Sequence, residues 1–169
     1  THKMSQTKVQ FELLNDASSK LIKEVTASSS ATVSFVNGSS DVVFDGTFDA
    51  YEVLYINVHP ASDDVEFGFK ATINGSDFGV ATTNTFNFDL NKEDGSGTAT
   101  FAYNTSYDSV QSTGLVNVLH SVGNGNDESA SGRMIIYAPA STTFVTGLQF
   151  AMSSGNIDAG TFKLIGHRT

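Results

Sequence analysis

Three pairs of adjacent carboxylates are the residues of this 169-residue chain best suited to hold a metal ion or to act as acid and base. Calcium takes several oxygen ligands from such loops, and glycoside hydrolysis needs two carboxylates that flank the scissile bond. No pair shows the alternating Asp-x-Asp-x-Asp-Gly spacing of a dedicated calcium loop. We therefore expect solvated charges in turns, with no metal and no cofactor. The pairs are Asp63-Asp64, Glu93-Asp94 and Asp127-Glu128.

The four histidines lack the short spacings by which two imidazoles share one metal ion. They stand at His2, His59, His120 and His167. The sequence also lacks a Gly-x-Ser-x-Gly nucleophile elbow, a phosphate-binding loop and a dinucleotide fingerprint. We therefore predict no catalytic residues and expect that the protein is not an enzyme.

Tyrosine is the remaining residue type that could serve a binding site, because it combines a flat apolar face with a hydroxyl. Four of the five tyrosines lie in strand-like segments, whereas Tyr107 lies in the polar segment 104–108 and is expected to be exposed. The segment 123–132 has no hydrophobic anchor and is expected to form an exposed, mobile loop. The predicted glycan or host-contact surface consists of Tyr107, Asn124, Asn126 and Asp127.

The elements that must position these residues are strands, because apolar side chains recur with a period of two. The segment 65–73 places five apolar side chains on one face, and 86–90 and 99–103 repeat the alternation. About ten such short segments separated by turns predict an all-β fold. We expect an antiparallel two-sheet β-sandwich, jelly-roll-like. The other predicted strands are 32–35, 51–58, 115–119, 133–137, 148–152 and 161–165.

Two of these strands, 51–58 and 133–137, are more continuously apolar and are predicted to be central strands covered on both faces. Turn dipeptides separate several strands, because Asn-Gly and Asp-Gly tolerate positive φ and favour hairpins. These dipeptides are Asn37-Gly38, Asn74-Gly75 and Asp94-Gly95.

The first 26 residues differ from the rest, since four of the nine basic residues lie within the first 23 positions. Two strand-like runs, 9–14 and 21–25, precede the small-residue linker ASSSA at 27–31. We divide the chain into an N-terminal attachment arm or hairpin (1–26) and a β-sandwich domain (27–169). The alternative is that the arm is an ordinary first hairpin of the same sandwich. The predicted assembly residues are Lys8, Val9, Phe11, Leu13, Leu21 and Lys23.

The formal charge of −9 argues against binding of nucleic acid, because phosphate neutralisation needs a basic footprint. The sequence contains no apolar run long enough for a transmembrane helix, so membrane insertion is not expected.

Several phrases of the chain resemble small β-sandwich structural proteins of tailed marine phages. The segment 153–166, SSGNIDAGTFKLIG, resembles the close of those proteins, and 51–60, YEVLYINVHP, resembles one of their opening strands. Further similar phrases lie at 27–35, 111–126, 132–137 and 139–144.

The resemblance implies a non-enzymatic virion protein at the particle surface that contacts other virion proteins and forms a homotrimer. The leading interpretation is a tail-fibre or spike head domain that contacts the host surface, with a host glycan as a further partner. A capsid-decorating knob is the alternative within the virion, and a free carbohydrate-binding module is the alternative outside it.

Overall fold

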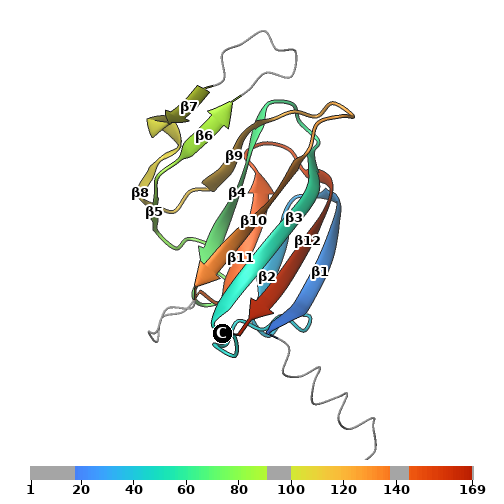
Figure 1. Cartoon of the computed structure of the whole chain (residues 1–169), viewed down its shortest axis with the longest axis vertical. Coiled ribbons are helices and arrows are strands. Elements are labelled where there is room, and N and C mark those ends of the chain that lie inside the picture. The colour runs from blue at the N-terminus through green and yellow to red at the C-terminus, as the bar shows by residue number, and fades with distance from the viewer. Residues whose placement is uncertain (1–17, 91–99, 138–144, 169) are drawn as a thin grey trace, which may run out of the picture.

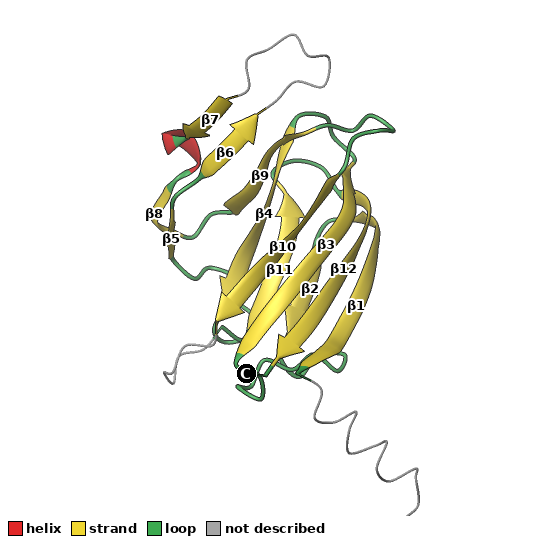
Figure 2. Ribbon diagram, viewed as in Figure 1, coloured by secondary structure: helices red, strands yellow, loops and turns green. Residues whose placement is uncertain are grey.

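The computed structural model describes residues 18–90, 100–137 and 145–168. Strands dominate these residues, whose helical content is one 3-10 helix, η1 (Thr105–Tyr107) (Figure 2). The predicted all-β class is confirmed.

Two four-stranded antiparallel sheets pack face to face (Figure 1). The first sheet has the order β1-β12-β3-β10 and the second the order β2-β11-β4-β9. When these eight strands are numbered by their place along the chain, the orders become 1-8-3-6 and 2-7-4-5, the arrangement of a jelly roll. The first sheet contains β1 (Ser19–Ser30), β12 (Ile157–His167), β3 (Ala50–Pro60) and β10 (Ala130–Tyr137). The second contains β2 (Val33–Val36), β11 (Gly147–Met152), β4 (Val65–Thr72) and β9 (Val116–Val122).

Aromatic side chains fill the space between the two sheets. Phe67, from the alternating segment of β4, is fully buried. Its ring centroid lies 5.2 Å from that of Tyr55, 5.9 Å from that of Phe150 and 6.1 Å from that of Phe162. These partners come from both sheets, so the predicted apolar face of β4 is the core face. Phe69, which the alternation of 65–73 places on the same face as Phe67, is half-buried and packs on the margin of this cluster.

Strand β10 corrects the prediction that 133–137 forms a central strand. Although β3 pairs with β10 on one side and β12 on the other, β10 pairs only with β3. Its Ile135 and Tyr137 are 39% and 77% exposed, because they point away from the core at the edge of the sheet. A continuous apolar run therefore marked an edge strand with an uncovered outer face.

Strand β1 corrects the predicted domain boundary at residues 26 and 27. β1 pairs with β12 from Ser19↔His167 to Ser30↔Ile157, so the boundary falls inside one strand. The ASSSA segment is not a linker over its first four residues, because Ala27 and Ser28 pair with Gly160 and Ala159. Leu21 and Lys23 thus belong to the sandwich, where a β-bulge separates them, and the other predicted assembly residues lie outside the described residues.

The turn dipeptides do not join hairpins as predicted. Gly38 and Gly75 have φ of +77° and +80°, which confirms the turns. However, Asn37-Gly38 leads from β2 in one sheet to β3 in the other. Asn74-Gly75 leads out of β4 into an insertion, and Asp94-Gly95 lies outside the described residues.

The insertion connects two neighbouring strands of the second sheet, β4 and β9, by residues 73–115. It contains two short antiparallel ribbons, and we call these ribbons together with η1 the inserted lobe (residues 82–90 and 100–112). One ribbon pairs β5 (Thr82–Asn84) with β8 (Ser109–Ser112), and the other pairs β6 (Asn87–Leu90) with β7 (Thr100–Tyr103). Figure 1 shows the lobe beside β9, outside the two main sheets.

Candidate contact surface at one end of the sandwich

Tyr107 joins the inserted lobe to the sandwich. The side chain of Asn104 caps η1 by accepting a hydrogen bond from the Ser106 amide, which places Tyr107 at the last position of this helix. The Tyr107 hydroxyl donates to Glu66 Oε1 in β4 at 3.0 Å, and Ser153 Oγ donates to Glu66 Oε2 at 2.5 Å. Tyr107 is therefore half-buried, so the prediction that its ring is exposed was wrong.

The same contacts shift the ionisation of both partners. The hydroxyl groups of Ser153 and Tyr107 donate to the Glu66 carboxylate and lower its pKa below the ordinary value of 4.5, although burial partly opposes them. Burial and the hydrogen bond to Glu66 raise the pKa of Tyr107 above 10.0. Both shifts favour a carboxylate that accepts and a phenol that donates, which is the arrangement observed.

A cluster of four rings continues from Tyr107 across to β9. The Tyr107 ring lies 4.7 Å from the ring of His120 and 5.5 Å from that of Phe86. Phe88 lies 6.2 Å from His120 and 6.3 Å from Phe86. Tilted and edge-to-face rings at such separations attract one another. The lobe is thus held against β9 by ring packing and against β4 by the Tyr107–Glu66 hydrogen bond.

A cavity of about 410 Å³ opens between β6 of the lobe and β9 of the sandwich. Its walls are mainly apolar, with polar side chains among them. Of its lining residues, Phe86 is buried and Phe88 is half-buried. The lining residues are Phe86, Asn87, Phe88, Asp89, Val118, Leu119, His120 and Ser121.

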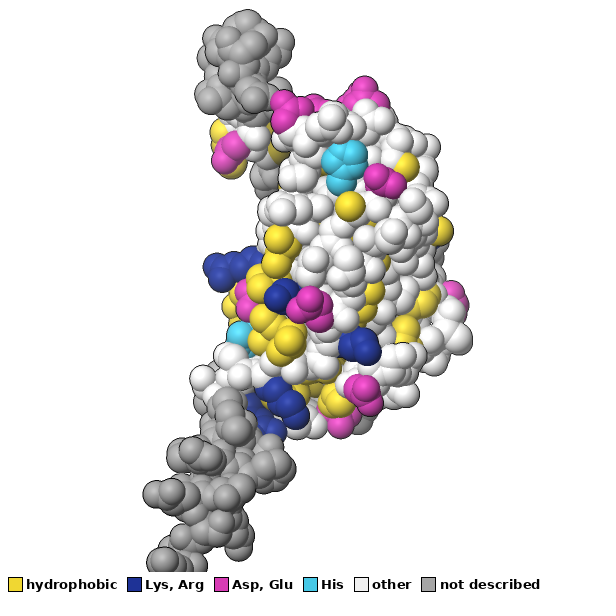
Figure 3. All heavy atoms as spheres, turned by 90° about the vertical axis from the view of Figure 1, so that its right-hand side faces the viewer, with side chains coloured by type: hydrophobic (Ala, Val, Ile, Leu, Met, Phe, Trp, Pro, Cys, Tyr) yellow, Lys and Arg dark blue, Asp and Glu magenta, His cyan; other side chains and the backbone are white. Residues whose placement is uncertain are grey.

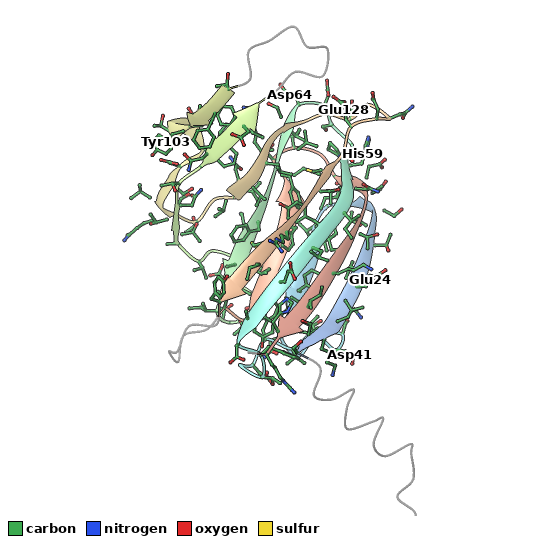
Figure 4. All side chains as sticks on the ribbon, viewed as in Figure 1. Glu24, Asp41, His59, Asp64, Tyr103 and Glu128 are labelled. Atoms are coloured by element: carbon green, nitrogen blue, oxygen red, sulfur yellow. The ribbon has the colours of Figure 1, made fainter. Side chains whose placement is uncertain are left out.

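Two further hollows lie along the same end of the sandwich, and the first of them adjoins this cavity. One, of about 380 Å³, shares His120 with the cavity and reaches Asp127 and Glu128. The other, of about 480 Å³, shares Asp127 with the first hollow and is also lined by Asn126 and His59. Figure 4 shows Glu128, Asp64 and His59 at this end, with Tyr103 on the lobe beside it.

The predicted contact residues are therefore only partly brought together. Tyr107 packs against His120, and Asp127 lines the hollow that His120 also lines. Asn126 is exposed beside Asp127. Asn124 instead connects two loops by hydrogen bonds. Its main-chain N–H donates to Asp63 Oδ1 at 3.3 Å, and its side-chain Nδ2 donates to the Ala61 carbonyl at 3.4 Å.

The outward face of the lobe displays apolar side chains. Phe101 and Tyr103 alternate with Ala102 in β7 and are 78% and 54% exposed. Val110, in β8, is 82% exposed. The Tyr103 hydroxyl donates to Asp108, which fixes this ring on the surface. Exposed apolar groups that lie together on one part of a protein are a feature of surfaces that contact other molecules.

Sequence reasoning missed His120, Glu66, Phe86 and Phe88 as parts of the site. The alternation at 86–90 predicts a strand but does not indicate that its phenylalanines border a cavity. For Glu66 the sequence contains one indication. Glu66 lies on the polar side of the alternating segment that forms β4, so it was not expected in the core.

The described residues contain no group of three His, Asp or Glu side chains that could hold a metal ion. They also contain no helix long and apolar enough to cross a membrane. Comparison with protein-family models, with curated proteins and with solved structures gave no significant match.

Proposed function

We propose that this chain is a non-enzymatic structural protein at the surface of a phage particle. In this proposal it forms the head domain of a tail fibre or spike and contacts the host surface. The resemblance of several phrases, from 27–35 to 153–166, to marine phage proteins supports the virion assignment. The jelly-roll topology is compatible with it, because viral capsid proteins use this fold among many other protein classes.

The inserted lobe is the observation that carries the host-contact role. It adds nothing to the eight strands that complete the two sheets. It nevertheless presents Phe101, Tyr103 and Val110 to solvent, and its other face forms a cavity with β9. Binding sites are commonly placed on insertions that a rigid scaffold holds in position.

A competition experiment tests the contact role. Purified protein added to host cells before the phage should reduce adsorption, because it occupies the same host receptor. A Phe101→Ala/Tyr103→Ala variant should compete much less well, whereas Leu21→Ala, which removes an exposed apolar side chain of β1 at the far edge of the first sheet, should compete like the natural protein. Equal competition by both variants, or none by the natural protein, would contradict the proposed contact role.

A second candidate function, capsid decoration, is favoured by the outer face of the first sheet. This face carries exposed apolar residues on three strands, with charged groups among them, and Figure 3 shows hydrophobic side chains interspersed with charged ones on one side of the molecule. Glu52 lies within the face and contacts His167 Nε2 at 2.9 Å and Arg133 at 3.8 Å. Such a face suits repeated contact with a protein lattice. The exposed apolar residues are Leu21, Ile56, Ile135 and Tyr137.

A further inference from the structure

We propose that the cavity between β6 and β9 binds one uncharged pyranose ring of a glycan. This inference deepens the proposed host contact and rests on it for its biological setting. Its physical basis is the shape, lining and charge of the cavity itself. The volume of about 410 Å³ lies within the usual range of small-molecule sites.

The walls of the cavity suit the face of a sugar ring. A pyranose presents C–H groups on its faces, and these pack on aromatic and aliphatic surfaces. Phe88 of β6 and Phe86, just before β6, supply one wall, while Val118 and Leu119 supply another from β9. The edge-to-face arrangement of Phe88 and His120, at 6.2 Å, places a ring from each side at the same cavity.

The rim of the cavity suits the hydroxyl edge of a sugar. His120 and Ser121 line it from β9 and offer an imidazole and a hydroxyl, which can donate and accept hydrogen bonds. Few polar groups on an otherwise apolar surface are typical of sites that fix the orientation of a small ligand. A purely apolar ligand would leave these groups without a role.

The charge of the site favours a neutral ligand. The lining contains the carboxylate of Asp89 but no lysine or arginine, and the whole chain has a formal charge of −9. A sialic acid, uronic acid or phosphorylated sugar would meet this negative potential without a basic partner. A quaternary ammonium group would suit a cage of aromatic faces, and the experiment below separates it from a sugar.

The site is also held in place before any ligand arrives. Tyr107 packs against His120 at 4.7 Å and is fixed by its hydrogen bond to Glu66, which Ser153 holds in turn. The ring of His120 is further constrained by Ser121 Oγ, 2.5 Å from its Nδ1. A site that needs little reorganisation loses less free energy on binding.

The direct test is a titration of the ¹⁵N-labelled full chain with the methyl pyranosides of glucose, galactose and N-acetylglucosamine, followed by amide chemical shifts. We expect at least one of these sugars to shift amides within 86–89 and 118–121. Methyl glucuronide and choline, titrated in parallel, should cause smaller shifts there. No shift by any neutral sugar, shifts located elsewhere, or stronger binding of methyl glucuronide or choline would overturn the proposal.

Two substitutions to alanine, one in the cavity and one far from it, provide the comparison. Phe88 lines the cavity, whereas Leu21, in β1 at the far edge of the first sheet, is 51% exposed. Phe88→Ala should weaken sugar binding by about tenfold or more, and Leu21→Ala should leave it unchanged. Equal affinities of the two variants would overturn the proposal. If Phe88→Ala disturbs the lobe, Ser121→Ala tests the polar rim, and the shift map of the natural protein decides independently.

Failure of this inference and failure of the proposed function give different results. A protein that blocks phage adsorption but binds no neutral sugar at the cavity contradicts only the cavity assignment. A protein that binds such a sugar at the cavity but is absent from phage particles contradicts the virion role and fits a free carbohydrate-binding module.

Discussion

Phe67 is the single side chain on which the stability of the sandwich depends most clearly. It is fully buried and contacts rings from both sheets, so Phe67→Ala leaves a cavity as well as losing apolar burial. We expect the free energy of unfolding to fall by roughly 3–5 kcal/mol, measured by chemical denaturation. Phe69→Ala should lower the free energy of unfolding by less, because Phe69 is only half-buried. Phe101→Ala should change it little, because Phe101 is exposed. Equal losses for all three would contradict the assigned core.

Glu66 should give the lobe contact a pH dependence. Its folded pKa is lowered, so its stabilising contribution is fully present above the ordinary value of 4.5 and is lost as pH falls through the folded pKa. The free energy of unfolding of the natural protein should therefore fall more steeply in this acid range than that of Glu66→Gln. Tyr107→Phe, which removes one donor to Glu66, should cost about 1 kcal/mol at neutral pH. Parallel pH profiles of the natural protein and Glu66→Gln would contradict the assigned role of Glu66.

For individual residues, the sequence indicated which side chains could make contacts better than it indicated what would surround them. Tyr107 was selected as a contact residue because its neighbours are polar, and it does lie beside the cavity. Its half-burial could not be predicted, because the partner Glu66 is 41 positions away in another element. The position of His120 beside the lobe could not be predicted either, because nothing in its local sequence indicates that a lobe folds over it.

Among the elements, β1 determines how much of the N-terminus the fold requires. A chain that begins at Ser18 keeps all of β1 and should retain the folded sandwich. Deletion of residues 1–25 removes seven residues of β1 and their pairing with β12, so this chain should be strongly destabilised. Circular dichroism and thermal unfolding of the two truncated proteins measure the difference. A fully folded, equally stable 26–169 chain would restore the attachment-arm interpretation.

The strands with alternating or continuous apolar residues could be predicted, and those with few apolar residues could not. The segments 65–73, 86–90 and 99–103 became β4, β6 and β7 with boundaries close to those expected. Strands β5 and β8, with sequences TTN and SVQS, were missed because their pairing depends on main-chain hydrogen bonds rather than on apolar burial. The edge position of β10 could not be predicted, because strand order is decided by contacts distant in sequence.

For the whole molecule, we predict a homotrimer. Closed cyclic symmetry is the usual form of homo-oligomers, and the exposed apolar residues of the first sheet and of the lobe offer surface for self-contact. Light scattering of the purified chain at micromolar concentration should give three times the monomer mass of 17.9 kDa. A monomeric mass under these conditions would contradict the prediction.

The location of the protein on the phage tests the central claim most directly. Particles can be labelled with a gold-conjugated antibody raised against the purified protein and viewed by electron microscopy. The proposed fibre or spike role predicts gold at the distal tail structures and none over the capsid. Gold spread evenly over the capsid would support the decorating role instead, and particles that carry no label, together with no peptide of this chain in their mass spectrum, would contradict the virion assignment.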